Sequence, residues 1–174
     1  MMLTSFDLIS DLHVDTWPEP FDWTGRATST HALVLGDIAQ DRDLLIEVLK
    51  NISNCYQAVF YVDGNTEHKE HMDNISASYD DLARRINAIK NVVFLQDNVV
   101  VIDGVAILGT NGWWGYDFDM TIDPEQSALW HQETDGYSSA ITQCIRKMST
   151  TDANYMIASV KRLQTHVDVK KIVM

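Results

Sequence analysis

The stretch FDLISDLHVD at residues 6–15 decides the fold, because it joins a short strand to a cluster of acidic and imidazole side chains. Its first five residues are typical of a β-strand. The same arrangement recurs twice: Ala32–Leu35 runs into GDIAQD at 36–41, and Ala58–Val62 runs into DGNTEH at 63–68. Strands that end in polar clusters are typical of a parallel α/β sheet, whose ligand sites form at the carboxyl ends of the strands.

Segments with helical periodicity lie between these strands and after them. Apolar residues recur at helical spacing through 42–52, which predicts a helix with one apolar face, and a second helix is predicted near 78–90. Three apolar runs then lie between residues 92 and 108, and the Asp103-Gly104 pair before the last of them is a strong hairpin signal. This order predicts an α/β layered fold that contains a mixed sheet.

The last third of the chain has a weaker pattern. Residues 122–149 are expected to be helical with an interruption at Gly136. A further helix is predicted by an apolar core stripe at Met156, Val160, Leu163 and Val167. The run 171–174 is predicted to be a strand, and because nothing follows it we expect that the chain is cut there or that a partner or missing segment completes its sheet.

Composition restricts the class of protein. With 174 residues, the chain has the length of a single domain, spanning 1–174. Its 25 acidic and 13 basic residues give a formal charge of −12, which disfavours a nucleic-acid scaffold because phosphates are neutralised by clustered Lys and Arg. Fourteen of the acidic residues lie among the first 80 residues. They are expected to form a solvated surface unless the fold brings their carboxylates together at one point.

Cysteine content and hydropathy indicate the compartment. Cys55 and Cys144 lie far apart and form no C-x-x-C pair, so neither a cysteine zinc site nor a disulfide scaffold is expected. Residues 1–5 hold no basic side chain before a long apolar run, and the longest apolar runs are far too short to cross a membrane. A cytoplasmic protein without a membrane partner is therefore predicted.

The polar clusters contain candidate metal ligands. Asp11 and His13 lie two residues apart, so at an extended strand end they would share a face and reach one ion. Asp37, at a turn permitted by Gly36, could bridge to a second ion, and Asn65 could give that ion a carbonyl oxygen. Such ligands suit manganese, iron, zinc or magnesium, and paired divalent ions support in-line displacement at phosphorus. Capping or turn formation is the alternative role for the aspartates, and a left-handed turn for Asn65.

These motifs together resemble the calcineurin-like metallophosphoesterase family. The resemblance rests on Asp11-x-His13, Gly36-Asp37 and Gly64-Asn65 in this order, with residues 109–114 after the meander. It implies a sandwich of mixed sheets flanked by helices, lacking the C-terminal part of the family fold. It also implies that Asp11 and His13 bind a first metal, that Asp37 bridges and that Asn65 binds the second. The implied activity is hydrolysis of phosphomonoesters or phosphodiesters by a hydroxide that bridges two ions.

Two departures concern the proton donor and the remaining ligands. The family histidine that protonates the leaving group is replaced by Thr66, so His68 becomes a tentative catalytic candidate. Its alternative is an exposed face shared with Lys69, Glu70 and His71. The family's later histidines have no counterpart here, which favours a rival function: a catalytically impaired binding or regulatory module that retains the fold.

Other candidate residues are predicted to have structural roles. His166 is expected at a helix end, where an imidazole interacts favourably with the helix dipole. His31 and His131 lack matching partners in the sequence, and Trp113 and Trp114 are interpreted as packing residues, with a wall of the pocket as the alternative. The predicted function is therefore metal-dependent hydrolysis of a small phosphoester substrate.

Overall fold

Four parallel strands form the first sheet of the computed structural model, which describes residues 5–115 and 123–174. They lie in the order β1-β2-β3-β4, with β1 at Phe6–Ile9, β2 at His31–Leu35, β3 at Ala58–Val62 and β4 at Val92–Phe94. The register pairs Ile9 with Val34 and Val34 with Tyr61, so the carboxyl ends of β1, β2 and β3 lie side by side. The predicted ligand-bearing edge of a parallel sheet is therefore present.

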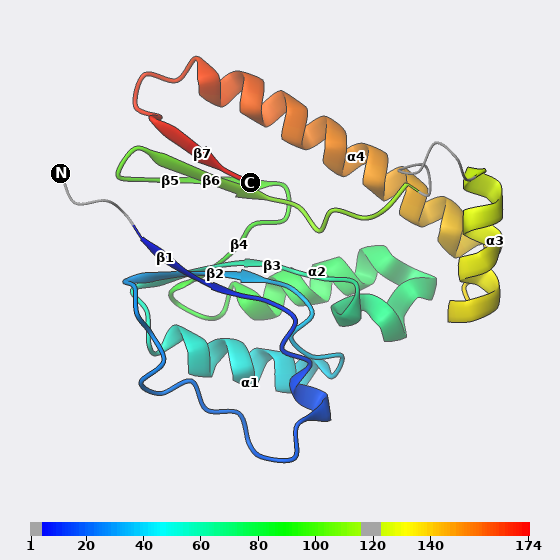
Figure 1. The fold of residues 1–174 in the computed structure, drawn as a ribbon, viewed down its shortest axis with the longest axis horizontal. Helices are drawn as coiled ribbons and strands as arrows, with labels where there is room; N and C mark the ends of the chain where they lie inside the picture. The colour runs from blue at the N-terminus through cyan, green and yellow to red at the C-terminus, as the bar shows by residue number, and fades with distance from the viewer. Residues whose placement is uncertain (1–4, 116–122) are drawn as a thin grey trace. The chain divides into compact units, whose positions relative to one another are not determined.

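Two helices cover one face of this sheet (Figure 1). Helix α1 (Arg42–Ser53) begins at Asp41, whose side chain accepts a hydrogen bond from Leu44 N, and it buries the apolar face that its periodicity predicts. Helix α2 (Ile75–Ile86) follows a 3₁₀ segment, η2 (Thr66–Asn74), so it begins earlier than the sequence suggested. The shared core contains Leu45, Leu49, Ile52, Leu82 and Ile86 from the helices and Val34, Val59 and Tyr61 from the strands.

A second sheet packs on the opposite face of the first through a small apolar cluster. It has the order β5-β6-β7, with β5 at Asn98–Ile102, β6 at Val105–Gly109 and β7 at Lys171–Val173. Strands β5 and β6 form the predicted antiparallel hairpin, whereas β7 is parallel to β6, so this sheet is mixed. Phe60, Leu95 and Ile107 are the buried residues between the two sheets.

Contacts divide the chain into two compact units. Residues 1–111 and 170–174 form the first unit, which holds both sheets, and Gly112–Val169 form the second. The second unit contains α3 (Pro124–Asp135) and α4 (Ser139–Gln164). The described residues thus form a mixed α/β protein with a parallel four-stranded sheet, a second sheet and four α-helices. A single domain over the whole chain stays a prediction.

The second unit differs from its prediction at two points. Gly136, with φ 71°, ends α3, as expected, but α4 then continues through both of the separately predicted helices. The stripe residue Val167 is wrong as a core residue, because α4 ends at Gln164 and Val167 is 92% exposed beyond it. Residue 122 of the expected helix, and residues 1–4 of the expected leaderless start, lie outside the described residues.

Two expectations about the wider chain can be compared with the structure. Cys55 and Cys144 are both free thiols, which agrees with the prediction that neither forms a disulfide. Among the described residues, none of the helices combines the length and the apolar character that crossing a membrane requires. The compartment itself stays a prediction.

Candidate metal centre

Three of the predicted ligands converge after β1 and β2. Asp11, His13 and Asp37 each offer a ligand atom, and these atoms all lie within 4.8 Å of one another. His13 Nε2 is 3.9 Å from Asp37 Oδ2. The Asp11 side chain is exposed and the other two are half-buried, so the group is open to solvent on one side. The structure thus contains a possible Asp–His–Asp metal-binding group.

The convergence depends on an unusual backbone. Asp11, His13 and Asp37 have φ values of 54°, 44° and 53°, in the left-handed region that non-glycine residues seldom occupy. The expectation that Asp11 and His13 share a face of an extended strand end is therefore wrong, because β1 already ends at Ile9. Left-handed turns bring the two side chains together instead, and such conformations concentrate at functional sites.

Backbone hydrogen bonds join the loop after β1 to the loop after β2. Asp11 N donates to Gly36 O at 3.2 Å, and His13 N donates to Asp37 O at 3.0 Å. Val14 N then donates to Ile38 O at 2.8 Å. The two loops are about 25 residues apart in sequence, but these bonds hold their backbones side by side at the spacing of paired strands. The His13 imidazole is thereby kept beside the Asp37 carboxylate.

The loop after β3 closes in on the same aspartate. A Cβ atom built on Gly64 would lie 2.1 Å from Asp37 Oδ1, and one on Gly36 would lie 2.4 Å from Gly64 N. Only glycine permits this close approach. Thr66 N donates to Asp37 Oδ1 at 3.0 Å, so the loop that carries Asn65 lies against this carboxylate. Asn65 has φ −72° and makes no capping hydrogen bond, which removes the left-handed turn as its explanation.

Glu67 connects these loops, and the sequence analysis gave it no role. Its side chain is 1% exposed, and its carboxylate accepts hydrogen bonds from Asp37 N (3.1 Å), Ile38 N (2.7 Å) and Gly64 N (2.7 Å). Burial raises the pKa of Glu67 above its ordinary value, although the hydrogen bonds from Ile38 and Gly64 oppose the rise. The only signal in the sequence is an acidic residue three positions after Gly64 in the first turn of a helix.

His68 lies in a different environment from the one expected. Its side chain is fully buried, so the exposed face predicted for it is wrong, although His71 is exposed. His68 Nε2 lies 2.6 Å from Asp63 Oδ2, and Nδ1 lies 2.8 Å from Ser78 Oγ. This geometry gives no support to a role as proton donor to a substrate, because both ring nitrogens face buried protein atoms.

The Ser78–His68–Asp63 series has the order of a hydrolase triad but the burial of a structural network. All three side chains are at most 4% exposed. Arg42 Nη2 donates to Ser78 Oγ at 2.8 Å, and Asn111 Nδ2 donates to Asp63 Oδ2 at 2.7 Å. A nucleophile must reach its substrate, so we interpret this series as a buried support for the loop after β3.

The remaining histidines lie against aromatic rings or at a helix end. His31 is next to Phe6, with 5.8 Å between ring centroids, and His131 is 5.6 Å from Trp114. Trp113 is 3% exposed, which agrees with the packing interpretation. His166 follows the C-cap of α4, and its backbone N–H donates to Leu163 O, whereas an interaction of its imidazole with the helix dipole stays a prediction.

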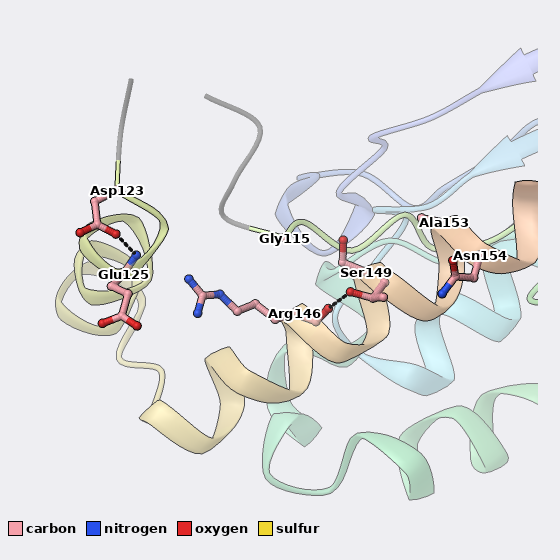
Figure 2. A pocket seen from close by; sticks show the side chains of 8 residues that line it. Gly115, Asp123, Glu125, Arg146, Ser149, Ala153 and Asn154 are labelled. Carbon is pink, nitrogen blue, oxygen red and sulfur yellow. Dashed lines mark hydrogen bonds between the residues drawn. The ribbon is translucent and has the colours of Figure 1, made fainter. Parts of the chain in front are cut away.

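A polar cavity lies in the second unit, between the start of α3 and one face of α4 (Figure 2). Its volume is about 610 Å³, and Asp123, Glu125, Arg146, Ser149 and Asn154 are among its lining residues. Asp123 is the N-cap of α3 and accepts a hydrogen bond from Glu125 N. The lining includes none of the candidate metal ligands, so this cavity and the Asp–His–Asp group are separate features of the chain.

The donor chemistry of the Asp–His–Asp group fits a divalent ion. Two carboxylates and one imidazole are borderline-to-hard ligands, which suit manganese, iron, zinc or magnesium better than soft copper. Three fixed ligands with one open side also leave coordination positions for water or substrate. Asp11, His13 and Asp37 could therefore hold one ion, and Asp37 with Asn65 are the candidates for a second.

Comparisons with known proteins give a fold but no family. No family model matches the chain, and no curated protein matches it. The chain is similar to a solved structure, phosphopantetheinyl hydrolase from Mycobacterium tuberculosis, with a TM-score of 0.61 and 18% sequence identity. The alignment covers 92% of this chain and 63% of that one, so this chain spans less than two thirds of that protein's length. Likeness at this identity shows the fold alone.

The comparisons contradict the assignment to the calcineurin-like metallophosphoesterase family. The assignment required a family match, and none is found. The similar structure is described as a phosphopantetheinyl hydrolase. The prediction failed because it rested on motifs of two or three residues each, and such short motifs recur in unrelated proteins. The α/β class, which rests on longer patterns, is confirmed, whereas only the second of the two sheets is mixed because the first is wholly parallel.

Proposed function

We propose that this chain is a metal-dependent hydrolase of small phosphoesters. The observation that carries the proposal is the convergence of Asp11, His13 and Asp37 within 4.8 Å at the carboxyl edge of the parallel sheet. The similar solved structure is named as a hydrolase of a phosphopantetheinyl group, which supports hydrolysis as the reaction class. A site at this edge is also where α/β sheets bind their ligands.

Each residue has a separate task in the proposed site. Asp11, His13 and Asp37 would hold one divalent ion, and Asp37 with the Asn65 amide oxygen would hold a second. Bound divalent ions lower the pKa of a coordinated water and withdraw charge from the phosphoryl group. The chain's own contribution is to hold these side chains in place before the substrate arrives, through left-handed turns and hydrogen bonds between the loops.

Strain in the ligand loops supports a functional interpretation over simple turn formation. The β5–β6 hairpin turn explains its own left-handed residues, whereas the three left-handed candidate ligands come from two loops that lie in no such hairpin turn. A protein keeps such conformations where the surrounding structure enforces them, and functional sites are the usual place. Mutual repulsion between the Asp11 and Asp37 carboxylates would also be relieved by a cation.

The test is hydrolysis of chromogenic phosphomonoesters and phosphodiesters with and without Mn²⁺. We expect turnover that requires the metal and a rise in the thermal midpoint when Mn²⁺ is added. Asp11→Asn and Asp37→Asn should reduce both effects to the level of the metal-free protein. Asp41→Asn is the matched control, because Asp41 caps α1 in the next part of the same loop and asparagine caps equally well.

The outcomes separate the proposal from its rival. Turnover in the wild type that survives in Asp37→Asn would show that the reaction does not use this group. Thermal stabilisation by Mn²⁺ without turnover on any ester would favour a binding or regulatory module. If Mn²⁺ produces neither turnover nor thermal stabilisation in the wild type, the proposal is overturned.

A further inference from the structure

Glu67 contacts the candidate metal centre through backbone atoms only. Oε1 accepts from Ile38 N, and Oε2 accepts from both Asp37 N and Gly64 N. Both carboxylate oxygens are therefore occupied by N–H groups, and the side chain is 1% exposed. Glu67 is placed to act on the centre through other residues and not as a ligand.

The hydrogen bonds define the backbone on both sides of Asp37. Its own N–H and the N–H of Ile38 both point to the same carboxylate, which fixes the two peptide groups that flank the Asp37 Cα atom. The direction of the Asp37 side chain follows from these two peptide planes. They hold the residue at φ 53°, a left-handed conformation that an unconstrained aspartate seldom adopts because it is energetically unfavourable.

The same carboxylate also sets the distance between two loops. Gly64 N and Asp37 N share Oε2, so the loop that carries Asn65 cannot move away from Asp37 without breaking one of these bonds. There is no spare space at this point, because a Cβ on Gly64 would lie 2.6 Å from Asp37 N. Buried hydrogen bonds to a charged acceptor are among the stronger ones in proteins.

We infer that Glu67 is the positioning residue of the metal centre: it holds Asp37 and the Asn65 loop in their metal-binding geometry by binding three backbone N–H groups. The inference rests on the proposed function, because it takes the Asp–His–Asp group to be a metal site. Residues that orient metal ligands without touching the ion change metal affinity by about 10- to 100-fold when they are replaced.

The experiment measures Mn²⁺ affinity by calorimetric titration of the full chain at low temperature. Glu67→Gln keeps the size of the side chain but replaces one acceptor oxygen by a donor that faces backbone N–H groups. We expect it to bind Mn²⁺ about 10- to 100-fold more weakly than the wild type. Its fold is checked by circular dichroism before metal is added. If Glu67→Gln does not fold, Glu67→Asp, which keeps the charge but shortens the reach, replaces it under the same criterion.

Two control variants separate positioning from general stability. Glu70→Gln changes an exposed carboxylate in the same 3₁₀ segment, whose hydrogen bond is to the Gln40 side chain. Leu49→Ala removes a buried side chain from α1 and destabilises the fold, and Leu49 makes none of the hydrogen bonds that join the ligand loops. Both should bind Mn²⁺ within about twofold of the wild type while folded, a range that corresponds to less than one tenfold step in affinity.

The results distinguish failure of the inference from failure of the proposed function. If the wild type binds Mn²⁺ and the folded Glu67 variant binds it within the range of the controls, Glu67 is structural and the inference is overturned. If the wild type itself binds no Mn²⁺, the proposed function fails and the inference fails with it. If Leu49→Ala lowers Mn²⁺ affinity as much as the Glu67 variant does, the inference is also overturned, because the loss of affinity would then follow from lower stability of the fold.

Discussion

Asp103 and Asp37 have nearly the same left-handed backbone, with φ values of 51° and 53°, but for different reasons. Asp103 lies in the tight turn between β5 and β6, next to Gly104 with φ 81°, and a two-residue hairpin of this kind requires left-handed residues. Asp37 lies in no such turn. Its conformation is held by hydrogen bonds with residues about 30 positions away in sequence: Asp37 N donates to Glu67, and Thr66 N donates to the Asp37 carboxylate.

The comparison separates local from tertiary control of the same conformation. At Asp103 the strand pairing on both sides and the following glycine are enough, so the turn is visible in a dipeptide of sequence. At Asp37 the conformation depends on Glu67, on Gly64 and on the loop after β1. Strain enforced by distant contacts is the kind that marks functional sites, and the following predictions test this difference.

The largest effect is expected from a pair of glycines with the same backbone. Gly36 and Gly25 have φ values of 65° and 74°, but a Cβ on Gly36 would lie 2.4 Å from Gly64 N, whereas a Cβ on Gly25 has nothing within 4 Å. Gly25→Ala should cost about 1 kcal/mol from backbone strain alone. Gly36→Ala should cost about 2–5 kcal/mol, because steric overlap with backbone adds to the strain.

Urea unfolding of both glycine variants at 25 °C measures this difference in the free energy of unfolding. Mn²⁺ affinity, measured on the folded fraction, should fall in Gly36→Ala and remain unchanged in Gly25→Ala. Equal losses of stability in the two variants would mean that the loops after β2 and β3 do not approach each other as closely as described.

A smaller effect is expected at a carboxylate outside the candidate site that is also held by distant residues. Asp7 in β1 accepts hydrogen bonds from Thr28, Ser29 and the Tyr56 hydroxyl. Burial acts to raise the pKa of Asp7, but these hydrogen bonds outweigh it and hold the pKa well below its ordinary value. Asp7→Asn should therefore lower the free energy of unfolding by about 1 kcal/mol at neutral pH.

The pH dependence of this contribution has a definite sign. Because the pKa of Asp7 is lower in the folded protein, its stabilisation is complete above the unfolded pKa of about 3.9 and is lost as the pH falls toward the folded value. The difference in unfolding midpoint between wild type and Asp7→Asn should thus shrink below pH 4. A difference that grows on acidification would contradict the assignment.

The smallest effect is expected at the locally controlled turn. Asp103→Asn should change the free energy of unfolding by less than about 0.5 kcal/mol, since Asn-Gly suits this hairpin as well as Asp-Gly. Mn²⁺ affinity should be unchanged, because Asp103 is exposed in the second sheet. Calorimetric titration alongside Asp37→Asn measures both substitutions under one set of conditions. A loss of metal binding in Asp103→Asn would remove the distinction between the two turns.

Much of the fold could be predicted from sequence because it follows from local periodicity. The strands at β2 and β3 and the helix α1 match their predicted ranges closely, since α1 buries one apolar face and β3 is buried on both. The boundary errors at α2 and α4 occur where polar sequence is helical, at η2 and through residues 150–155, where α4 joins the two predicted helices. There the apolar period is weak, and helix capping and tertiary contacts determine the ends.

The candidate ligands were predictable as residues but not as a geometry. Acidic and imidazole side chains after three parallel strands must come near one edge, which placed Asp11, His13 and Asp37 together. His68 was predicted on a surface because its neighbours Lys69 and Glu70 are charged and exposed. Its actual partners, Asp63 and Ser78, become neighbours only when η2 packs against α2 and the loop after β3.

The sequence by itself determined which side chains this protein brings to the edge of its sheet, because the positions of the strands and of the polar clusters that follow them are local properties of the chain. The tertiary structure decided how those side chains are held: the left-handed turns at Asp11, His13 and Asp37, the buried carboxylate of Glu67 and the burial of His68. These features depend on hydrogen bonds between loops up to 30 residues apart, and pairing over such distances leaves no periodic signal in the sequence.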